Sequence, residues 1–175
     1  PILGDWQNWA EVREKNREDL FGFEPLWPEG CLDKSFFQKR LARQSKDWHE
    51  GHCYSFLVID MTGHLIGGAN INNVIRGAAH FASIGYWLDH EKRGQGLMQE
   101  ALNLLLDFGF NELELHRINA ATLPDNKKSV DLLKRLGFEE EGYAKKYLNI
   151  AGEWQDHRLF GLCAEDRETG LEQKD

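Results

Sequence analysis

The residues best suited to binding a ligand lie in one short segment, Lys92–Leu97, which joins a strand-like run to an amphipathic helical run. At the start of a helix several backbone N–H groups have no intrahelical acceptor, and the helix dipole is positive there. Gly94 and Gly96 allow this backbone to approach a ligand closely. Lys92 and Arg93 add positive charge beside it. The segment therefore predicts a site for a pyrophosphate group.

The two glycines also fit an ordinary strand–turn–helix connection, which needs glycine for its backbone geometry alone. No Gly-Lys-Ser or Gly-Lys-Thr follows, and the third glycine of the dinucleotide-binding motif is missing. Nucleoside triphosphates and NAD are therefore disfavoured as ligands. The remaining candidate is a diphosphate of the coenzyme A type.

Several motifs in the second half of the chain resemble those of a known protein family. The segment and the helix after it resemble the acyl-CoA-binding motif of GNAT acetyltransferases. The next motif of that superfamily is similar to Asn126-x-x-Ser129-x-x-Leu132-Leu133-x-x-Leu136-Gly137-Phe138-x-x-Glu141-Gly142. Three stretches resemble the RimJ/RimL-type protein N-terminal acetyltransferases, RimJ more closely: His116-Arg117-Ile118-x-Ala120, Glu141-Gly142-Tyr143-Ala144-Lys145 and Gly152-x-Trp154-x-Asp156-His157.

Length and patterning predict one α/β domain over residues 1–165, followed by a polar C-terminal tail at 166–175. Apolar spacing predicts helices at 5–20, 35–48, 97–110 and 127–136. Strands are expected at 54–60, 65–72, 79–88, 116–121, 143–150 and 155–162, the last two as a closing hairpin. The resemblance implies a mixed, mostly antiparallel sheet flanked by helices. The strand that usually precedes the first helix in the family is not visible ahead of Asp5.

The resemblance implies how acetyl-CoA is held as the cosubstrate. The strands at 79–88 and 116–121 are expected to splay apart, so that the pantetheine arm pairs with the free edge of the first one. A backbone N–H of that strand then steadies the oxyanion of the reacting thioester. The implied cofactor-binding residues are Tyr86, Trp87, Leu88, Lys92, Arg93, Gly94, Gln95, Gly96, Leu97, Met98, Asn126 and Ser129.

Two members of this set have a second interpretation. By the resemblance, Asn126 binds the pantetheine arm and Ser129, the catalytic residue, hydrogen-bonds the departing thiolate. The same residues also fit a helix N-cap and its N3 position. A departure from the family is Glu91, which stands three residues before Gly94 where many GNAT proteins have Gln or Arg. We expect little effect, because main-chain N–H groups make most of the phosphate contacts.

The positions that carry a general base in relatives are apolar here. RimI-type relatives have Glu five residues before the motif asparagine and Tyr seven residues after it, where this chain has Ala121 and Leu133. The glutamate proposed as base in RimL-type enzymes aligns with Leu148. A protein α-amine has a pKa of roughly 7.7–8.0, against about 10.4 for lysine, so about a quarter or more of α-amines are neutral near pH 7.5. We therefore expect an α-amine acceptor that loses its proton through water.

Candidate contacts to the acceptor are Glu24, Tyr143 and Trp154. Glu24 lies in the loop at 21–30, where a carboxylate can receive a cationic amine or remain merely solvated. Tyr143 and Trp154 belong to the closing hairpin, whose aromatic residues also suit core or rim packing. We expect no metal site at residues 49–52, His-Glu-Gly-His, because the histidines are three residues apart and the glycine interrupts the helix that such a motif needs.

The composition limits the partners and the compartment. The net charge of −8 disfavours nucleic acid and suits a basic partner, although it also simply aids solubility. No apolar run is long enough to span a membrane, and no secretion signal is visible. Cys31, Cys53 and Cys163 form neither a disulfide framework nor a zinc motif, so we expect reduced thiols in the cytoplasm. The sequence leaves open whether the protein is a monomer or a homodimer.

These observations favour an enzyme that transfers acetyl from acetyl-CoA to the N-terminal α-amine of a protein such as a ribosomal protein. A second enzyme hypothesis keeps the cosubstrate and replaces the acceptor by a small amine, for example a polyamine or an aminoglycoside. A third hypothesis is a catalytically silent CoA-binding module, which the missing base positions keep open. An interaction protein without CoA is the fourth. Acceptor screening separates the first two, and turnover of acetyl-CoA separates both from the others.

Overall fold

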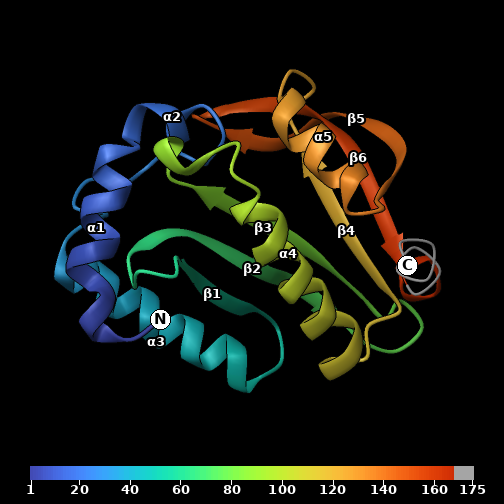
Figure 1. Cartoon of the computed structure of the whole chain (residues 1–175), viewed down its shortest axis with the longest axis horizontal. Helices are drawn as coiled ribbons and strands as arrows, with labels where there is room; N and C mark the ends of the chain where they lie inside the picture. The colour runs from blue at the N-terminus through green and yellow to red at the C-terminus, as the bar shows by residue number, and fades with distance from the viewer. Residues whose placement is uncertain (168–175) are drawn as a thin grey trace.

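The computed structural model describes residues 1–167, which fold around one six-stranded sheet (Figure 1). The helices are α1 (Trp6–Lys15), α2 (Arg17–Phe21), α3 (Lys34–His49), α4 (Leu97–Asp107) and α5 (Lys127–Arg135). The strands are β1 (Tyr54–Ile59), β2 (Leu65–Ile75), β3 (Phe81–Leu88), β4 (Arg117–Thr122), β5 (Glu139–Ile150) and β6 (Glu153–Cys163). The predicted single α/β domain fold is confirmed.

The strands lie in the order β1-β2-β3-β4-β6-β5. Every neighbouring pair is antiparallel except β3 and β4, which run parallel. A parallel pair needs a long crossover, and α4 supplies it between these two strands. The mostly antiparallel sheet expected from the sequence is therefore confirmed.

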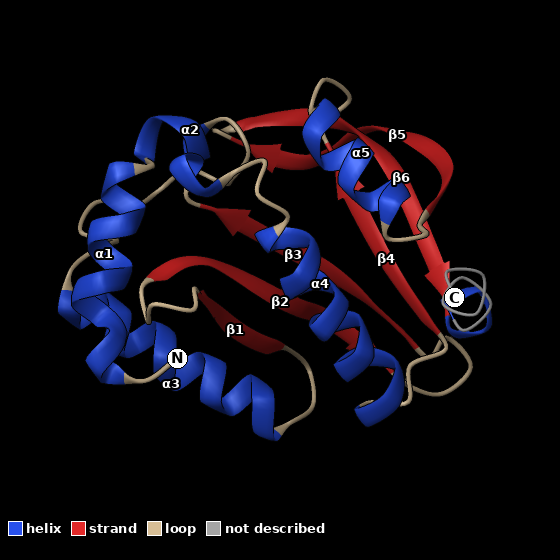
Figure 2. Cartoon of the chain, viewed as in Figure 1, coloured by secondary structure: helices blue, strands red, loops and turns tan. Residues whose placement is uncertain are grey.

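Different helices cover the two faces of the sheet (Figure 2). The helices α4 and α5 pack on one face and share the larger core. The most buried members of that core include Leu102, Leu106, Ile118, Leu133 and Phe160. The helices α1 and α3 enclose a smaller cluster around Trp9, Phe37 and Leu65. Each fully buried side chain of this size contributes about 1.5–3 kcal/mol, so Leu102 and Leu106 hold α4 on the sheet.

The helix expected over residues 5–20 is in fact two helices separated by Asn16, and the prediction of one helix is wrong. The Asn16 backbone, with φ −102° and ψ 14°, lies outside the α-helical region. Its side-chain Nδ2 donates to the Val12 carbonyl at 2.8 Å. Asparagine competes in this way with main-chain hydrogen bonds, which is why it disfavours helix interiors.

The helix expected over residues 97–110 is α-helical only as far as Asp107. A π-helical turn follows at Phe108–Glu112. Gly109 lies in this turn so close to the core that an added Cβ would stand 2.7 Å from Ile118 Cδ1 and 3.2 Å from Ile71 Cδ1. The wider turn thus brings the backbone directly onto the sheet before the chain enters β4.

The closing hairpin is longer than expected at its outer strand. β5 begins at Glu139, four residues before the predicted start at Tyr143. Its first residues are charged and exposed, which an edge strand tolerates, so they show no alternation of apolar and polar residues. The hairpin turn at Ala151 and Gly152 has positive φ at both residues, 50° and 88°.

The ends of the chain complete the description. A 3₁₀ turn at Leu3–Asp5 precedes α1, and β1 forms one edge of the sheet. Of the predicted tail at 166–175, the first two residues continue a helical turn and Arg167 Nη2 contacts Asp107 Oδ1 at 2.7 Å. Residues 168–175 lie outside the described part. Within residues 1–167 no helix combines the length and the apolar character needed to cross a membrane.

The sheet opens between β3 and β4. Only three residue pairs join these strands: Phe81 with Arg117, Ala82 with Ile118, and Ser83 with Asn119. Beyond them β3 continues to Leu88 with β2 as its partner, and β4 continues to Thr122 with β6 as its partner. The two strands therefore splay apart, and each leaves one main-chain edge free towards the opening.

Candidate functional site

The glycine pair lies at the N-terminus of α4 in a conformation that favours glycine. Gly94 and Gly96 have φ of 76° and 81°, and Gly96 is the N-cap residue of α4. Side-chain-bearing residues rarely adopt this left-handed region. A Cβ added at either glycine would meet no atom within 4 Å, so both positions face open space. With the unpaired first N–H groups of α4, they form an open cradle of main-chain donors that fits a diphosphate.

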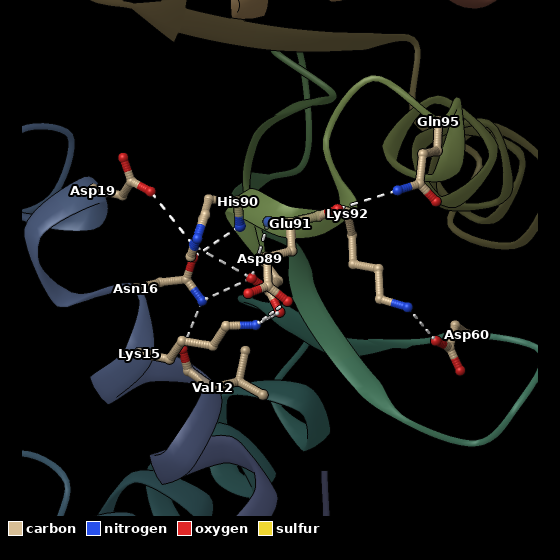
Figure 3. A network of polar contacts seen from close by, with 10 residues as sticks. All are labelled: Val12, Lys15, Asn16, Asp19, Asp60, Asp89, His90, Glu91, Lys92 and Gln95. Atoms are coloured by element: carbon tan, nitrogen blue, oxygen red, sulfur yellow. Dashed lines mark hydrogen bonds and ion pairs between the residues drawn. The ribbon is translucent and has the colours of Figure 1, made fainter.

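The basic residues of the cradle are paired with acids from neighbouring elements. Lys92 Nζ donates to Asp60 Oδ2 at 3.0 Å (Figure 3). Arg93 Nη1 lies 3.7 Å from Asp19 Oδ1. The positive charge predicted from these two residues is thus shared with carboxylates, so a diphosphate in the cradle would depend mainly on main-chain N–H groups.

The remaining cradle residues support the backbone rather than face the opening. Gln95 Nε2 donates to the Glu91 carbonyl at 3.1 Å. The Glu91 carboxylate, which replaces the usual Gln or Arg, lies 2.6 Å from Lys15 Nζ. Leu97 and Met98 pack with the larger core, so only their main-chain N–H groups remain for a ligand.

The free edge of β3 carries Tyr86, Trp87 and Leu88, whose side chains alternate between the two faces. Tyr86 and Leu88 pack with the larger core, and Trp87 packs with the smaller cluster. Tyr86 Oη lies 2.7 Å from Ser129 Oγ on α5, a hydrogen bond that the sequence did not suggest. Burial raises the pKa of Tyr86, while the bond to Ser129 acts in the opposite direction. The phenol is therefore protonated at neutral pH and able to donate.

Asn126 forms the N-cap of α5. Its Oδ1 accepts from the Ser129 N–H at 3.2 Å. The capping role considered from the sequence is therefore present. The cap uses only the Oδ1 atom of Asn126 and the main-chain N–H of Ser129. The Asn126 Nδ2 group and the Ser129 hydroxyl can still bind a ligand, so capping and ligand binding are compatible.

Glu24 has a cationic partner within the chain, and its contact with the acceptor stays a prediction. It accepts from Arg13 Nη1 and Nη2 at 2.7 and 2.5 Å, and from Trp27 Nε1 at 2.9 Å. The Arg13 guanidinium carbon lies 4.3 Å from the Trp27 ring centroid and 5.1 Å from that of Trp87. Glu24 thus fixes the Arg13 guanidinium in its position beside the Trp87 ring.

Tyr143 and Trp154 lie on the closing hairpin with side chains 54% and 63% exposed. The Tyr143 hydroxyl donates to Asp156 Oδ2 at 2.7 Å. The turn of the same hairpin reaches the loop before α3, where the Ala151 N–H donates to the Glu24 carbonyl at 2.9 Å. Tyr143 and Trp154 are therefore rim residues of the hairpin that borders this loop.

The three apolar residues at base positions have different surroundings. Leu133 is fully buried and holds α5 on the sheet. Ala121 is half-buried on β4, and Leu148 is exposed on β5. Since packing explains Leu133 and no carboxylate stands at any of the three positions, the chain does not place a base as those relatives do.

The motif at residues 49–52 lies at the end of α3, away from the cradle. Of its members, Glu50 and His52 approach Asp47 so that one ligand atom from each lies within 4.8 Å of the others. The two motif residues are exposed, and exposed acidic groups commonly gather in this way without a metal. The expectation that no metal binds there stays a prediction.

The contact between Asn16 and Asp89 beside the glycine loop was not predicted from the sequence. Asn16 and Asp89 are 1% and 5% exposed, and they hydrogen-bond to each other from positions far apart in the chain (Figure 3). An asparagine inside a helical run and an aspartate directly before the glycine loop were the available signals.

Comparisons with known proteins agree with this geometry. Residues 4–139 match the family described as an acetyltransferase (GNAT) domain. The chain is 40% identical over 172 residues to the ribosomal protein uS5-alanine N-acetyltransferase of Escherichia coli, covering 97% of this chain and 89% of that protein.

Two solved structures are similar over most of their length. The ribosomal-protein-S5-alanine acetyltransferase of Vibrio fischeri has a TM-score of 0.89 at 34% identity, over 95% of this chain and 91% of that one. RimJ of Mycobacterium smegmatis, in complex with CoA-disulfide, has a TM-score of 0.91 at 28% identity, over 99% of this chain and 87% of that one.

Proposed function

This chain belongs to the GNAT acetyltransferase family, and from that premise we propose that it transfers the acetyl group of acetyl-CoA to the N-terminal α-amine of a ribosomal protein. The observation that carries the proposal is the open cradle at Gly94 and Gly96 beside the splay of β3 and β4. The acceptor class is supported by the 40% identity to an enzyme named for alanine acetylation of ribosomal protein uS5.

In this proposal the cosubstrate is held mainly by main-chain groups. The N–H groups of residues 94–98 hold the diphosphate, and the free edge of β3 at residues 86–88 pairs with the pantetheine arm. Asn126 Nδ2 adds a donor from the other side of the splay. The CoA-disulfide in the similar RimJ structure supports coenzyme A as the ligand.

The proposed reaction forms a bond between the amine nitrogen and the acetyl carbonyl carbon and breaks the carbon–sulfur bond. Ser129 donates its hydroxyl proton towards the departing thiolate, and Tyr86 can replace that proton through the 2.7 Å hydrogen bond. The nitrogen releases its proton to water, and water returns a proton to Tyr86, so the products are the acetylated amine and the free CoA thiol. The protein supplies orientation, a backbone oxyanion donor and the leaving-group proton.

The chemistry at the base positions favours an α-amine over a lysine amine. An enzyme without a dedicated base can use only the fraction of acceptor that is already neutral. That fraction is about a quarter or more for an α-amine near pH 7.5 and roughly a thousandth for lysine. Replacing Leu133 by a base would also put an ionisable group into the core.

The remaining features of the chain suit this assignment. Cys31, Cys53 and Cys163 are all free thiols, which supports a reducing compartment such as the cytoplasm. The net charge of −8 suits a basic protein substrate better than a nucleic acid. We infer no metal requirement, and either a monomer or a homodimer is compatible with the proposal.

The test is release of CoA thiol from acetyl-CoA with matched acceptor peptides. One peptide begins with a free alanine and has a basic sequence without lysine. A second has the same sequence with a blocked N-terminus and one internal lysine. We expect a higher kcat/KM for the first peptide by at least tenfold near pH 7.5, because its amine is more often neutral.

Three outcomes would overturn the proposal in whole or in part. Equal or faster acetylation of the internal lysine would refute the α-amine assignment. Faster turnover of spermidine or an aminoglycoside than of any peptide would replace the acceptor by a small amine, and no thiol release with any amine would refute the activity.

A further inference from the structure

A buried polar network joins the break between α1 and α2 to the start of the glycine cradle (Figure 3). Asn16 is 1% exposed and lies at its centre. Its Nδ2 donates to the Val12 carbonyl at 2.8 Å and to Asp89 Oδ1 at 3.2 Å. Its Oδ1 accepts from the His90 N–H at 2.8 Å and lies 2.8 Å from His90 Nδ1. Both donors and both acceptor directions of the amide are therefore used.

Only an amide of this size satisfies all four contacts. The Oδ1 atom can only accept, so His90 must carry a proton on Nδ1 when it makes this contact. An aspartate could not donate to Asp89 and would repel its carboxylate. An apolar residue would leave the buried Asp89 oxygen and His90 N–H without this partner.

Asp89 connects Asn16 to the main chain of the glycine loop. It is 5% exposed, and its side chain also accepts from Lys15 Nζ at 3.0 Å and from the Glu91 N–H at 3.2 Å. It thereby caps the 3₁₀ turn at His90–Lys92, which leads directly into Gly94. Burial would raise the pKa of Asp89, but its partners Lys15, Asn16 and the Glu91 N–H outweigh burial and lower it. The carboxylate is therefore charged and fixed before the cradle begins.

The cradle needs support from neighbouring residues because its two glycines allow many backbone conformations. Gly94 and Gly96 have left-handed backbones, and nothing packs where their side chains would be. Glycine loses more conformational freedom on ordering than other residues, so an unanchored loop would populate many other shapes. A ligand that binds one of several shapes loses apparent affinity in proportion to the population of that shape.

We propose that Asn16 is a positioning residue for coenzyme A, which holds residues 89–92 so that the cradle is formed before the ligand arrives. It touches neither the diphosphate site nor the reacting atoms. It acts from the opposite side of the loop, through His90 and Asp89. This inference rests on the proposed function only in taking the cradle as the CoA site.

The test compares Asn16→Ala and Asn16→Asp with the wild type by calorimetric titration with CoA and by steady-state kinetics. If the formed cradle falls to about a tenth of molecules, the Kd for CoA rises about tenfold. The KM for acetyl-CoA should rise in parallel, while kcat at saturating acetyl-CoA stays within about twofold because the reacting groups are intact. Asn16→Asp keeps the size of the side chain but sets a second carboxylate against Asp89, so urea titration first identifies which of the two variants is folded, and the Kd is measured on that one.

Asn103→Ala is the matched control. Asn103 is a partly buried asparagine on α4 whose side chain accepts from Arg167 at 3.3 Å, away from the glycine loop. It should lower the melting temperature without changing the Kd for CoA. Unchanged CoA affinity in the folded Asn16 variant would overturn the inference. Failure of the wild type to bind CoA would refute the cradle itself, and binding without acetyl transfer would refute only the proposed activity.

Discussion

Replacing Gly96 by alanine should separate backbone strain from loss of the ligand site. Gly96 has φ of 81°, and its missing Cβ points into space with no atom within 4 Å. An alanine there meets no steric clash in the free protein, but it must adopt the left-handed region. That conformation costs roughly 1–2 kcal/mol for a residue with a side chain.

Both consequences can be measured on the same variant. For a chain of this length, a loss of about 1–2 kcal/mol lowers the melting temperature by roughly 2–8 °C, so the variant should remain folded at 25 °C. The added methyl group occupies the space assigned to the diphosphate. We expect the Kd for CoA, measured by calorimetric titration, to rise at least tenfold, equivalent to about 1.4 kcal/mol.

Gly77→Ala is the control for strain alone. Gly77 lies in the turn between β2 and β3 with φ of 71°, and it too has nothing within 4 Å of an added Cβ. It should show a similar fall in melting temperature with unchanged CoA affinity. If both variants bind CoA as the wild type does, the cradle is not the diphosphate site.

Three further predictions concern the chemistry and the stability of the site. Ser129→Ala should lower kcat about 100-fold with little change in the KM for acetyl-CoA, and Tyr86→Phe should lower kcat less. Steady-state rates equal to those of the wild type would refute the role of these residues as proton donors. Glu24→Ala should reduce the free energy of unfolding by about 1–3 kcal/mol in urea titrations, because it strips the largely buried Arg13 of its carboxylate; exposed Glu29→Ala should have little effect. The Thr62 hydroxyl, the His64 N–H and Lys92 hold the pKa of Asp60 below its ordinary value, so its stabilising effect is complete above about pH 4 and is lost as pH falls through the lower folded value. Asp60→Asn should therefore show a weaker loss of stability on acidification than the wild type, and identical acid profiles would contradict this.

The features that the sequence predicted correctly are those that local residues determine. The left-handed turn follows from two glycines between a strand and a helix, and the helix at Leu97 follows from its apolar spacing. Asn126 could be recognised as a cap because its partner Ser129 is only three residues away. In each case the physical cause lies within one or two turns of chain.

The features that were missed depend on partners distant in the chain. Asn16 breaks the first helix where its side chain meets Asp89, 73 residues later. Tyr86 meets Ser129 across 43 residues. The sequence also does not show that Arg13 from α1 folds back onto Glu24. Such pairings are decided by the sheet and its core, which no short pattern encodes.

The splay of the sheet also has a mechanical consequence. Within residues 1–167, strand pairing ties the half of the sheet carrying β1–β3 to the half carrying β4–β6 through three residue pairs at one end of β3 and β4. A molecule lying in the gap would act as an additional strand and tie the free ends of the halves together. Amide hydrogen exchange in residues 84–88 and 120–122 should then slow on ligand addition, and the two halves should stiffen as one body.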